Sequence, residues 1–410
     1  MANKTVKNPF RPGAGHMPPF LAGRKKEQDE FKDLLMQEVV LKNLVLTGLR
    51  GIGKTVLLET FKPVAIQMGW LWAGTDLSES TSISETNLAI RLLTDLSVVT
   101  SSIVVSVSER TGTGFAGKAI EVPTALNYPT LAAIYEHTPG LVADKLKGVL
   151  EFVWPYIRTA GKHGIVFAYD EAQNLADHTA KDQFPLSLLL DVFQSIQRKE
   201  ICYMLALTGL PTLFPKLVEA RTYSERMFHV VFLDPLNKEE TKAAVCKPIE
   251  EEDCIGFDEN SLTTVWLQTR GYPYFIQYVC REIFDIWVQA LNADEPPPMV
   301  PVEEITLKLD TDFFAGRWAK ATDRQRQLLW VISLLDNCEE EFTVQEVVAS
   351  APNKGLKKPF TNSHINQMLG SLSEVGLVYK NRHGKYSFAV PLLADFIKRQ
   401  AKRSLSALLE

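Results

Sequence analysis

A glycine-rich octapeptide, GLRGIGKT, occupies residues 48–55 and matches the pattern G-x-x-x-x-G-K-[ST] at every fixed position. Glycines let the backbone turn tightly, so that successive amide N–H groups can point at one anion. Lys54 would bring a positive charge to the terminal phosphates of a nucleotide, and the Thr55 hydroxyl could ligate Mg²⁺. The motif therefore predicts a phosphate-binding loop at the N-terminus of a helix.

Two adjacent carboxylates form a second candidate for chemistry. The apolar run GIVFAY at 164–169 is typical of a buried parallel strand, and Asp170 and Glu171 follow it directly. In an open α/β sheet, ligands bind beyond the carboxyl ends of the strands. We therefore expect Asp170 to face a metal ion through water, and Glu171 to orient or deprotonate an attacking water. Taken singly, each motif has a structural reading as a glycine turn or as two solvated acids; their co-occurrence favours a nucleotide site.

These residues need a sheet to position them, and the alternation of apolar runs with helical patterns predicts a doubly wound parallel α/β sheet. The expected strands cover residues 43–47, 69–76, 164–169, 202–208 and 230–233. The expected helices cover residues 23–35, 55–61 and 186–197. Residues 77–150 interrupt this pattern and are predicted to be an insertion, with helices near 85–97 and 141–159. Long insertions on such a core usually carry function, so this one is the best candidate for partner specificity.

The last ninety residues have a different pattern, in which three helices precede two short strands and a final helix. The expected helices cover 322–335, 343–350 and 361–374; the strands cover 377–380 and 385–389, and the last helix begins near 392. This order predicts a winged helix-turn-helix. Residues 311–410 carry 14 Lys and Arg against 10 Asp and Glu, a net charge of +4 that fits DNA binding or a solvated surface equally well.

Five segments together resemble AAA+ ATPases, with closest similarity to the origin-initiator-like branch and to STAND-type regulators. They are PFLAGRKKE (19–27), GLRGIGKT, VFAYDEAQNL (166–175), LALTGLP (205–211) and RGYPYFIQYV (270–279). The resemblance covers about residues 8–290, and the winged helix extends it to about 400. It implies a P-loop ATPase core at 20–236 behind an irregular arm at 1–19, a helical lid at 237–300 and a winged-helix domain at 311–410. It also implies that ATP is hydrolysed to ADP and phosphate with Mg²⁺.

The resemblance assigns roles to individual residues. The expected nucleotide-binding residues are Arg24, Gly48, Gly51, Ile52, Gly53, Lys54, Thr55, Val56 and Pro273, with Thr55 and Asp170 as metal ligands. The expected catalytic residues are Glu171, Lys54, the γ-phosphate sensor Thr208, and Arg221 and Arg226, which lie where a neighbouring subunit's arginine finger is usual. For Thr208 and the two arginines, ordinary structural roles remain equally compatible with the sequence.

One departure from the family concerns the lid. AAA+ lids usually carry an arginine that reaches the nucleotide, whereas here the sequence is Gly-Tyr-Pro at 271–273 with no arginine until Arg281. A Gly-x-Pro at this place resembles STAND-type ATPases and favours a nucleotide-dependent switch over a conventional ring.

Composition restricts the setting. The net charge of −5 gives no global basic field, and five cysteines without C-x-x-C spacing indicate free thiols in a reducing compartment. No secretory signal or membrane-length apolar run is visible, so we expect a cytoplasmic protein with no membrane contact. Three readings stay open: an ATPase switch, motor or loader subunit that binds double-stranded DNA through its winged helix, a STAND-type signalling or defence regulator acting through protein partners, and an inactive nucleotide-binding scaffold. Assembly into a homo-oligomer stays open as well.

Overall fold

A computed structural model describes residues 7–111, 118–250, 256–351, 360–382 and 384–403. The chain forms two compact units. The first, here the core unit, comprises residues 25–47 and 54–232. The second, here the lid–wing unit, comprises residues up to Arg24, residues 48–53 and the chain from Leu233 onward. Residues 112–117, Cys254 and His383 lie outside the described residues.

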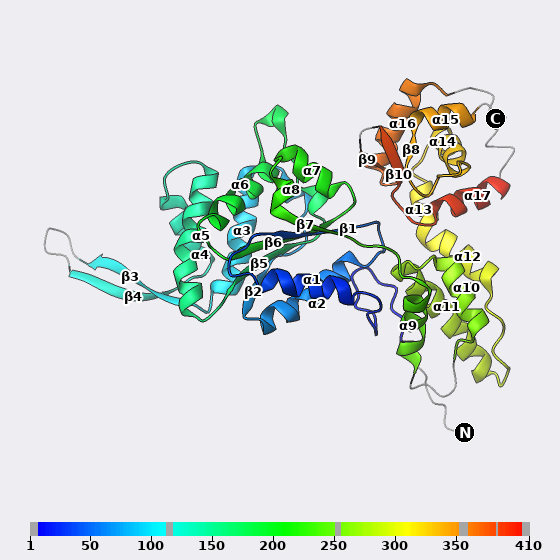
Figure 1. Cartoon of the computed structure of the whole chain (residues 1–410), viewed down its shortest axis with the longest axis horizontal. Helices are drawn as coiled ribbons and strands as arrows, with labels where there is room; N and C mark the ends of the chain where they lie inside the picture. Colours follow the sequence, from blue (N-terminus) through cyan, green and yellow to red (C-terminus); the bar gives the residue numbers. More distant parts are fainter. Residues whose placement is uncertain (1–6, 112–117, 251–255, 352–359, 383, 404–410) are drawn as a thin grey trace. The chain divides into compact units, whose positions relative to one another are not determined.

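The core unit is built on a five-stranded parallel sheet with the order β2-β5-β6-β1-β7 (Figure 1). The strands are β1 (Asn43–Thr47), β2 (Trp70–Ala73), β5 (Gly164–Tyr169), β6 (Tyr203–Gly209) and β7 (Phe228–Phe232). Every residue of β1, β5 and β6 is buried, as expected for parallel strands covered on both faces. This strand order places the ends of β1, β5 and β6, and hence the residues that follow them, at one edge of the sheet.

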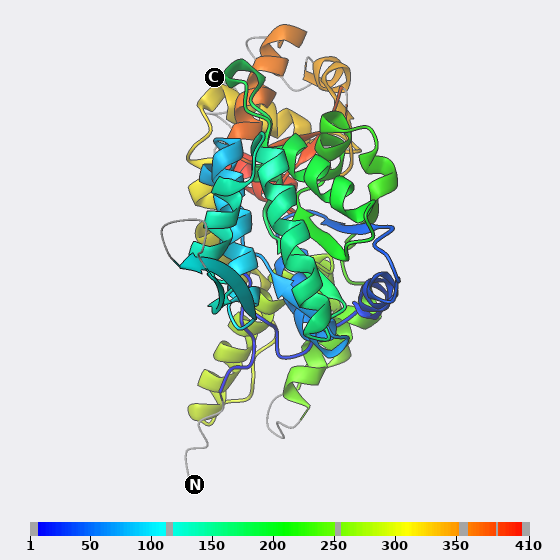
Figure 2. The same ribbon diagram turned by 90° about the vertical axis from the view of Figure 1, so that its left-hand side faces the viewer.

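Helices cover both faces of this sheet, which confirms the predicted doubly wound α/β fold (Figures 1 and 2). On one face lie α1 (Lys25–Leu35) and α2 (Lys54–Gln67), whose Phe31 and Phe61 rings stack at 4.3 Å. The other face carries α3 (Glu85–Thr100), α5 (Val142–Thr159) and α6 (Pro185–Gln197). The short helices α7 (Leu213–Ala220) and α8 (Ser224–Met227) lead from β6 to β7.

The insertion contains the two helices expected from the sequence and a hairpin that was not predicted. Strands β3 (Val104–Thr111) and β4 (Lys118–Ala125) pair antiparallel, and the ribbon projects from the body of the core unit (Figure 1). Helix α4 (Tyr128–His137) returns the chain to the body, where it packs with α3 and α5 (Figure 2). The first turn after β2 is a 3₁₀ helix at Glu79–Ser82.

In the lid–wing unit, the lid helices are α9 (Lys238–Cys246), α10 (Glu259–Thr269) and α11 (Pro273–Asn292). The described part of the N-terminal arm has no regular structure, as expected, but it is anchored on this lid. Phe10 is fully buried, with its ring edge-on to Phe257 and Phe284 at 6.3 and 6.1 Å. The Asn8 amide donates to the Asp285 carboxylate at 2.8 Å. The arm thus contributes to the lid core.

The C-terminal part has the predicted winged-helix order. Helices α12 (Val302–Leu309) and α13 (Ala315–Trp318), joined by a π-helical turn at Asp310–Phe314, lead into α14 (Asp323–Ser333), α15 (Val344–Ser350) and α16 (Asn362–Glu374). The strands β9 (Val378–Arg382) and β10 (Lys385–Phe388) form the wing, and α17 (Leu393–Arg403) follows. A short strand β8 (Phe342–Thr343), which was not predicted, completes the sheet β8-β10-β9. None of the helices in the described ranges combines the length and the apolar character needed to cross a membrane.

Candidate functional site

The glycine loop connects β1 to α2 and has the backbone that the octapeptide predicts. Gly51 and Gly53 have φ of +78° and +93°, in the left-handed region that favours glycine. Gly48 is packed tightly, because a Cβ there would lie 3.2 Å from the Leu233 carbonyl oxygen. Lys54 is the first residue of α2, so the loop leads directly into a helix N-terminus.

Two hydrogen bonds fix the outer side of the loop within the lid–wing unit. The Tyr274 N–H donates to the Gly51 carbonyl at 3.1 Å, and the Arg24 guanidinium donates to the Ile52 carbonyl at 3.3 Å. In a planar trans peptide the C=O and the following N–H point in opposite directions. Since Arg24 holds the Ile52 carbonyl, the Gly53 N–H points to the opposite side of the loop. The loop can therefore present the Gly53 N–H to an anion while the Gly51 and Ile52 carbonyls are occupied.

Pro273 is brought to the same place by helix α11. It is the first residue of that helix, where a proline needs no hydrogen-bond partner for its nitrogen, and the next residue is the Tyr274 that binds Gly51. Arg24 is 7% exposed and also donates to the Asp234 carbonyl at 2.8 Å. The predicted residues Arg24, Gly51, Ile52 and Pro273 thus gather in one unit.

A second group of candidate residues, in the core unit, is centred on Asp170 at the end of β5. Its carboxylate accepts hydrogen bonds from the hydroxyls of Thr55 and Thr208, one on each oxygen. Asp170 is 4% exposed, and its Oδ1 also accepts the Glu171 N–H at 2.7 Å. Residues from α2, β5 and β6 therefore converge on one carboxylate, and Lys54, 8% exposed, adjoins Thr55.

This donor set suits a magnesium ion. Thr55 and Asp170 supply hard oxygen ligands, and Mg²⁺ in nucleotide sites usually takes one or two protein oxygens together with phosphate and water. At the end of β1, the Thr47 hydroxyl is buried and has no hydrogen-bond partner among the described residues. A buried hydroxyl without a partner is unfavourable, so a polar ligand at this edge would also satisfy Thr47.

Glu171 stands out by its backbone. Its φ of +50° and ψ of +33° place it in the left-handed region, which costs a residue with a side chain on the order of 1 kcal/mol or more. Two hydrogen bonds hold this conformation. The Glu171 N–H donates to the Asp170 carboxylate, and the Asn174 N–H donates to the Glu171 carbonyl at 2.9 Å. The side chain is exposed beyond the strand, and its carboxylate accepts a hydrogen bond from the Gln173 amide.

Comparisons with known proteins bear on the fold. The model of a domain of unknown function (DUF8462) matches residues 311–397, and no curated protein matches the chain. Among solved structures, the ORC2 protein of Aeropyrum pernix is similar over 96% of this chain and 98% of its own. Its complexes with ADPNP and ADP give 12% sequence identity and a TM-score of 0.53. Its ADP form gives 14% identity and the same TM-score. This chain has an AAA+ fold. It also has the C-terminal winged helix predicted from the sequence.

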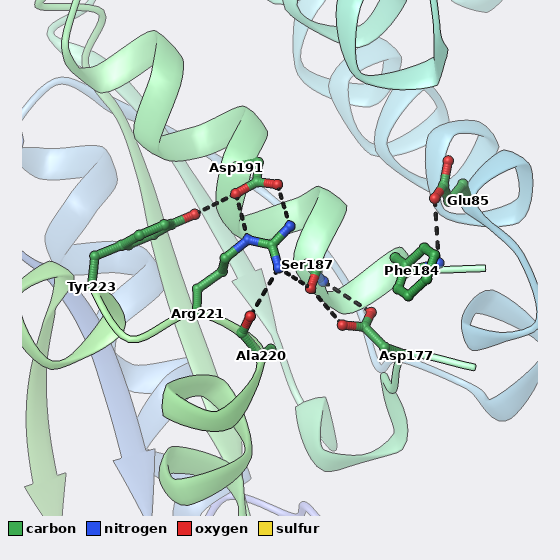
Figure 3. A network of polar contacts seen from close by, with 8 residues as sticks. All are labelled: Glu85, Asp177, Phe184, Ser187, Asp191, Ala220, Arg221 and Tyr223. Carbon is green, nitrogen blue, oxygen red and sulfur yellow. Dashed lines mark hydrogen bonds and ion pairs between the residues drawn. The ribbon is translucent and has the colours of Figure 1, made fainter. Parts of the chain in front are cut away.

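Within this AAA+ core, the two candidate arginines, Arg221 and Arg226, are in different environments, and Figure 3 shows that of Arg221. Arg221 follows α7 and makes a bidentate ion pair with Asp191 of α6, at 2.8 and 2.6 Å. It also donates to the Ser187 hydroxyl at 2.8 Å, and the Tyr223 hydroxyl donates to Asp191 at 2.6 Å. Arg226 on α8 is exposed, and its side chain has no hydrogen-bond or ion-pair partner in the described ranges.

Electrostatics agree with this tight pairing. Burial disfavours the charged form of Asp191, but the hydrogen bonds from Arg221 and Tyr223 outweigh it, so the pKa of Asp191 is lowered. The hydrogen bond to Asp191 raises the pKa of Arg221. Arg221 is therefore held as a cation by its own chain.

The motif residues were predicted from the sequence, but the residues that hydrogen-bond to them were not. Val56, expected at the nucleotide, is half-buried on the first turn of α2. Gln173, Asp191 and the main chain of Tyr274 were not predicted, although each contacts a predicted residue. Gln173 carried a usable signal, since it lies two residues after Glu171. Asp191 carried none, because a carboxylate inside a helical pattern is usually a solvated surface residue.

Proposed function

We propose that this chain binds Mg·ATP at the glycine loop and hydrolyses it to ADP and phosphate. The observation that supports this most directly is the convergence of Thr55 and Thr208 on Asp170, next to Lys54 and a complete phosphate-loop motif. The ORC2 structures with a similar fold are complexes with ADPNP and with ADP, which supports an adenine nucleotide as the ligand. We further propose an ATPase core at 20–236, a lid at 237–300 and a winged-helix domain at 311–410.

Each residue has a defined task in this proposal. The loop amides and Lys54 neutralise the phosphates. Thr55 and Asp170 would hold Mg²⁺, which would supply positive charge beside the phosphate oxygens. Glu171, exposed at the end of β5, orients the attacking water and accepts its proton. Thr208 shares Asp170 with Thr55, and this contact supports the proposal that its hydroxyl responds to the terminal phosphate.

The same contacts support a nucleotide-dependent switch. The outer side of the loop is hydrogen-bonded to Tyr274, at the start of a lid helix, and through Arg24 to the segment before α9. A phosphate that orders the loop would therefore change the packing of these lid segments. The switch would act on DNA as a motor or loader subunit, or on protein partners as in STAND-type regulators.

Replacement of Lys54 by Ala tests the site. We expect the affinity for Mg·ATP to fall at least about 100-fold, because a charge-assisted contact to the phosphates is lost. Lys62→Ala is the matched control, since Lys62 is an exposed lysine on the same helix. Calorimetric titration measures the affinity and circular dichroism checks the fold. Unchanged affinity in a folded Lys54→Ala protein contradicts the proposed site.

Replacement of Glu171 by Gln separates hydrolysis from binding. The amide keeps the size of the side chain but cannot accept the proton, so we expect kcat to fall about 10²- to 10⁴-fold while nucleotide affinity is retained. Phosphate release measured with a coupled assay reports the rate. A wild-type protein that binds ATP but releases no phosphate would instead support the inactive-scaffold reading.

A second candidate function, binding of double-stranded DNA, is supported by the surface of α16. This helix buries Ile365, Met368, Leu369 and Leu372. It exposes the hydrogen-bonding residues Asn362, Ser363, His364, Asn366 and Gln367. Such side chains can read base edges in a major groove, and Lys380 on the wing is exposed for a phosphate contact.

The wing provides the test of this candidate. We expect Lys380→Glu to weaken duplex binding and to reduce the slope of log K against log salt by about 1 or more. Fluorescence anisotropy at several salt concentrations, with and without ATP, measures both quantities. Lys62→Glu, remote from the wing in sequence, is the charge-matched control. If no duplex binds at low salt, the winged helix acts through protein partners and the STAND-type reading is favoured.

A further inference from the structure

The side chain of Gln173 contacts the side chain of Glu171, the proposed catalytic glutamate. It lies in the 3₁₀ turn Ala172–Asn174, two residues after Glu171, and its side-chain amide donates to the Glu171 carboxylate. The same side chain accepts the Leu210 N–H at 3.1 Å through its Oε1 atom. Gln173 therefore bridges the end of β5 and the residue that follows β6.

The chemistry of the amide fixes its orientation. A carboxylate only accepts hydrogen bonds and a main-chain N–H only donates, so the NH₂ group must face Glu171 and the carbonyl must face Leu210. The side chain is also closely confined, because a Cβ added at Gly209 would lie 2.6 Å from Gln173 Oε1. Both ends of this amide are thus committed to defined partners.

A half-buried lysine, Lys216, anchors the main chain of Gln173. The Lys216 ammonium group, on α7, donates to the Gln173 carbonyl at 2.7 Å. Burial lowers the pKa of Lys216, while Asp177 and Glu219 oppose this effect. Gln173 is consequently held from both sides by the segment that follows β6, the strand that carries Thr208.

We propose that Gln173 is a positioning residue that holds the Glu171 carboxylate at a fixed position relative to the end of β6. This inference rests on the proposed ATPase function. Glu171 is exposed and its side chain would otherwise sample several rotamers, only some of which suit an attacking water. If Gln173 holds the Glu171 side chain in one rotamer before the reaction, that side chain loses no conformational freedom during the reaction. The position matters, because a displacement of about 1 Å costs on the order of 10²-fold in rate.

Two substitutions separate positioning from a purely structural role. Gln173→Ala removes both hydrogen bonds, whereas Gln173→Glu keeps an acceptor for the Leu210 N–H but replaces the donor to Glu171 by a second carboxylate. A positioning role predicts that kcat falls about 10- to 100-fold in both variants while KM for ATP changes less than about twofold. A structural role at Leu210 alone predicts that Gln173→Glu retains the wild-type kcat.

The matched control is Gln67→Ala, since Gln67 is an exposed glutamine at the end of α2. Steady-state hydrolysis gives kcat and KM, and amide hydrogen exchange of Leu210 in the nucleotide-free protein reports the bridge without hydrolysis. We expect faster exchange in Gln173→Ala than in Gln173→Glu. Wild-type kcat in Gln173→Glu, or wild-type exchange at Leu210 in Gln173→Ala, overturns the inference. If the wild-type chain does not hydrolyse ATP, the proposed function is wrong. Amide hydrogen exchange at Leu210 would still decide whether Gln173 bridges the ends of the two strands.

Discussion

Arg221 and Arg226 lie five positions apart, yet only one of them has a role within its own chain. The Arg221 guanidinium is bound by Asp191 and Ser187, whereas Arg226 is exposed on α8. An arginine that completes a neighbouring active site must be available to a second molecule. The contacts therefore favour Arg226 for that task and assign Arg221 to the packing of α6 against the segment after α7.

We expect opposite effects from replacing these arginines. Arg226→Ala should leave nucleotide affinity and thermal stability unchanged but lower kcat, on the order of 10³-fold if a trans arginine contributes its usual amount. Arg221→Ala should lower the free energy of unfolding by at most about 1 kcal/mol, because both partners are more than a third exposed and solvent screens the pair. Hydrolysis assays and denaturant titrations distinguish the two, and a large loss of activity without loss of stability in Arg221→Ala would reverse the assignment.

The lowered pKa of Asp191 predicts how this pair responds to acid. A carboxyl whose pKa is lower in the folded protein stabilises the fold above its unfolded pKa, about 3.9, and loses that contribution as the pH falls through the folded value. The stability difference between wild type and Arg221→Ala should be largest above about pH 5 and should shrink below about pH 4. Urea titrations across pH 3 to 7 measure it, and a difference that grows on acidification would contradict the ion pair.

At the scale of the elements, the turn between α10 and α11 depends on a glycine. Gly271 has φ of +75°, and its carbonyl accepts the Leu236 N–H at 2.8 Å. A Cβ there would lie 1.9 Å from the Leu236 carbonyl oxygen, so no side chain fits without moving the main chain before α9. The Gly-Tyr-Pro sequence is therefore a structural joint of the lid as well as the approach to the glycine loop.

We expect Gly271→Ala to destabilise the protein by about 2 kcal/mol or more, since it combines an unfavourable φ with a backbone clash. Gly370→Ala is the control, because Gly370 lies inside α16 with open space around it. That control should be neutral or stabilising by about 0.5–1 kcal/mol. Thermal and urea unfolding provide both values, and equal effects of the two substitutions would contradict the assigned close approach.

The elements also show which parts of the fold can be predicted from the sequence. The fully buried strands β1 and β5 were placed to the residue, because an unbroken apolar run bounded by glycine or by charges is a local signal. The β3–β4 ribbon and the two-residue strand β8 were missed, since their pairing joins residues whose local patterns are weak. The same limit applies to the site: Lys54 and Asp170 follow from motifs, whereas the Gln173–Leu210 bridge depends on non-local packing.

At the scale of the whole molecule, the assignment of Arg226 to a neighbouring subunit's site predicts self-association, because a trans arginine can act only between copies of the chain. If Arg226 serves a neighbouring site, a bound γ-phosphate gives it a partner and stabilises the contact between copies. We expect the mass from light scattering at least to double when ADP is replaced by a non-hydrolysable ATP analogue. Arg226→Glu should abolish this increase, while Lys62→Glu should not. A mass that stays monomeric with both nucleotides would exclude a trans arginine.

The division of the chain into two units gives Arg24 a wider importance. The polypeptide crosses from one unit to the other at four peptide bonds, after residues 24, 47, 53 and 232. The Arg24 guanidinium hydrogen-bonds the carbonyls of Ile52 and Asp234, so one side chain fastens the main chain beside three of these four crossings. Loss of this single side chain would therefore release the glycine loop and the segment before α9 from each other at the same time.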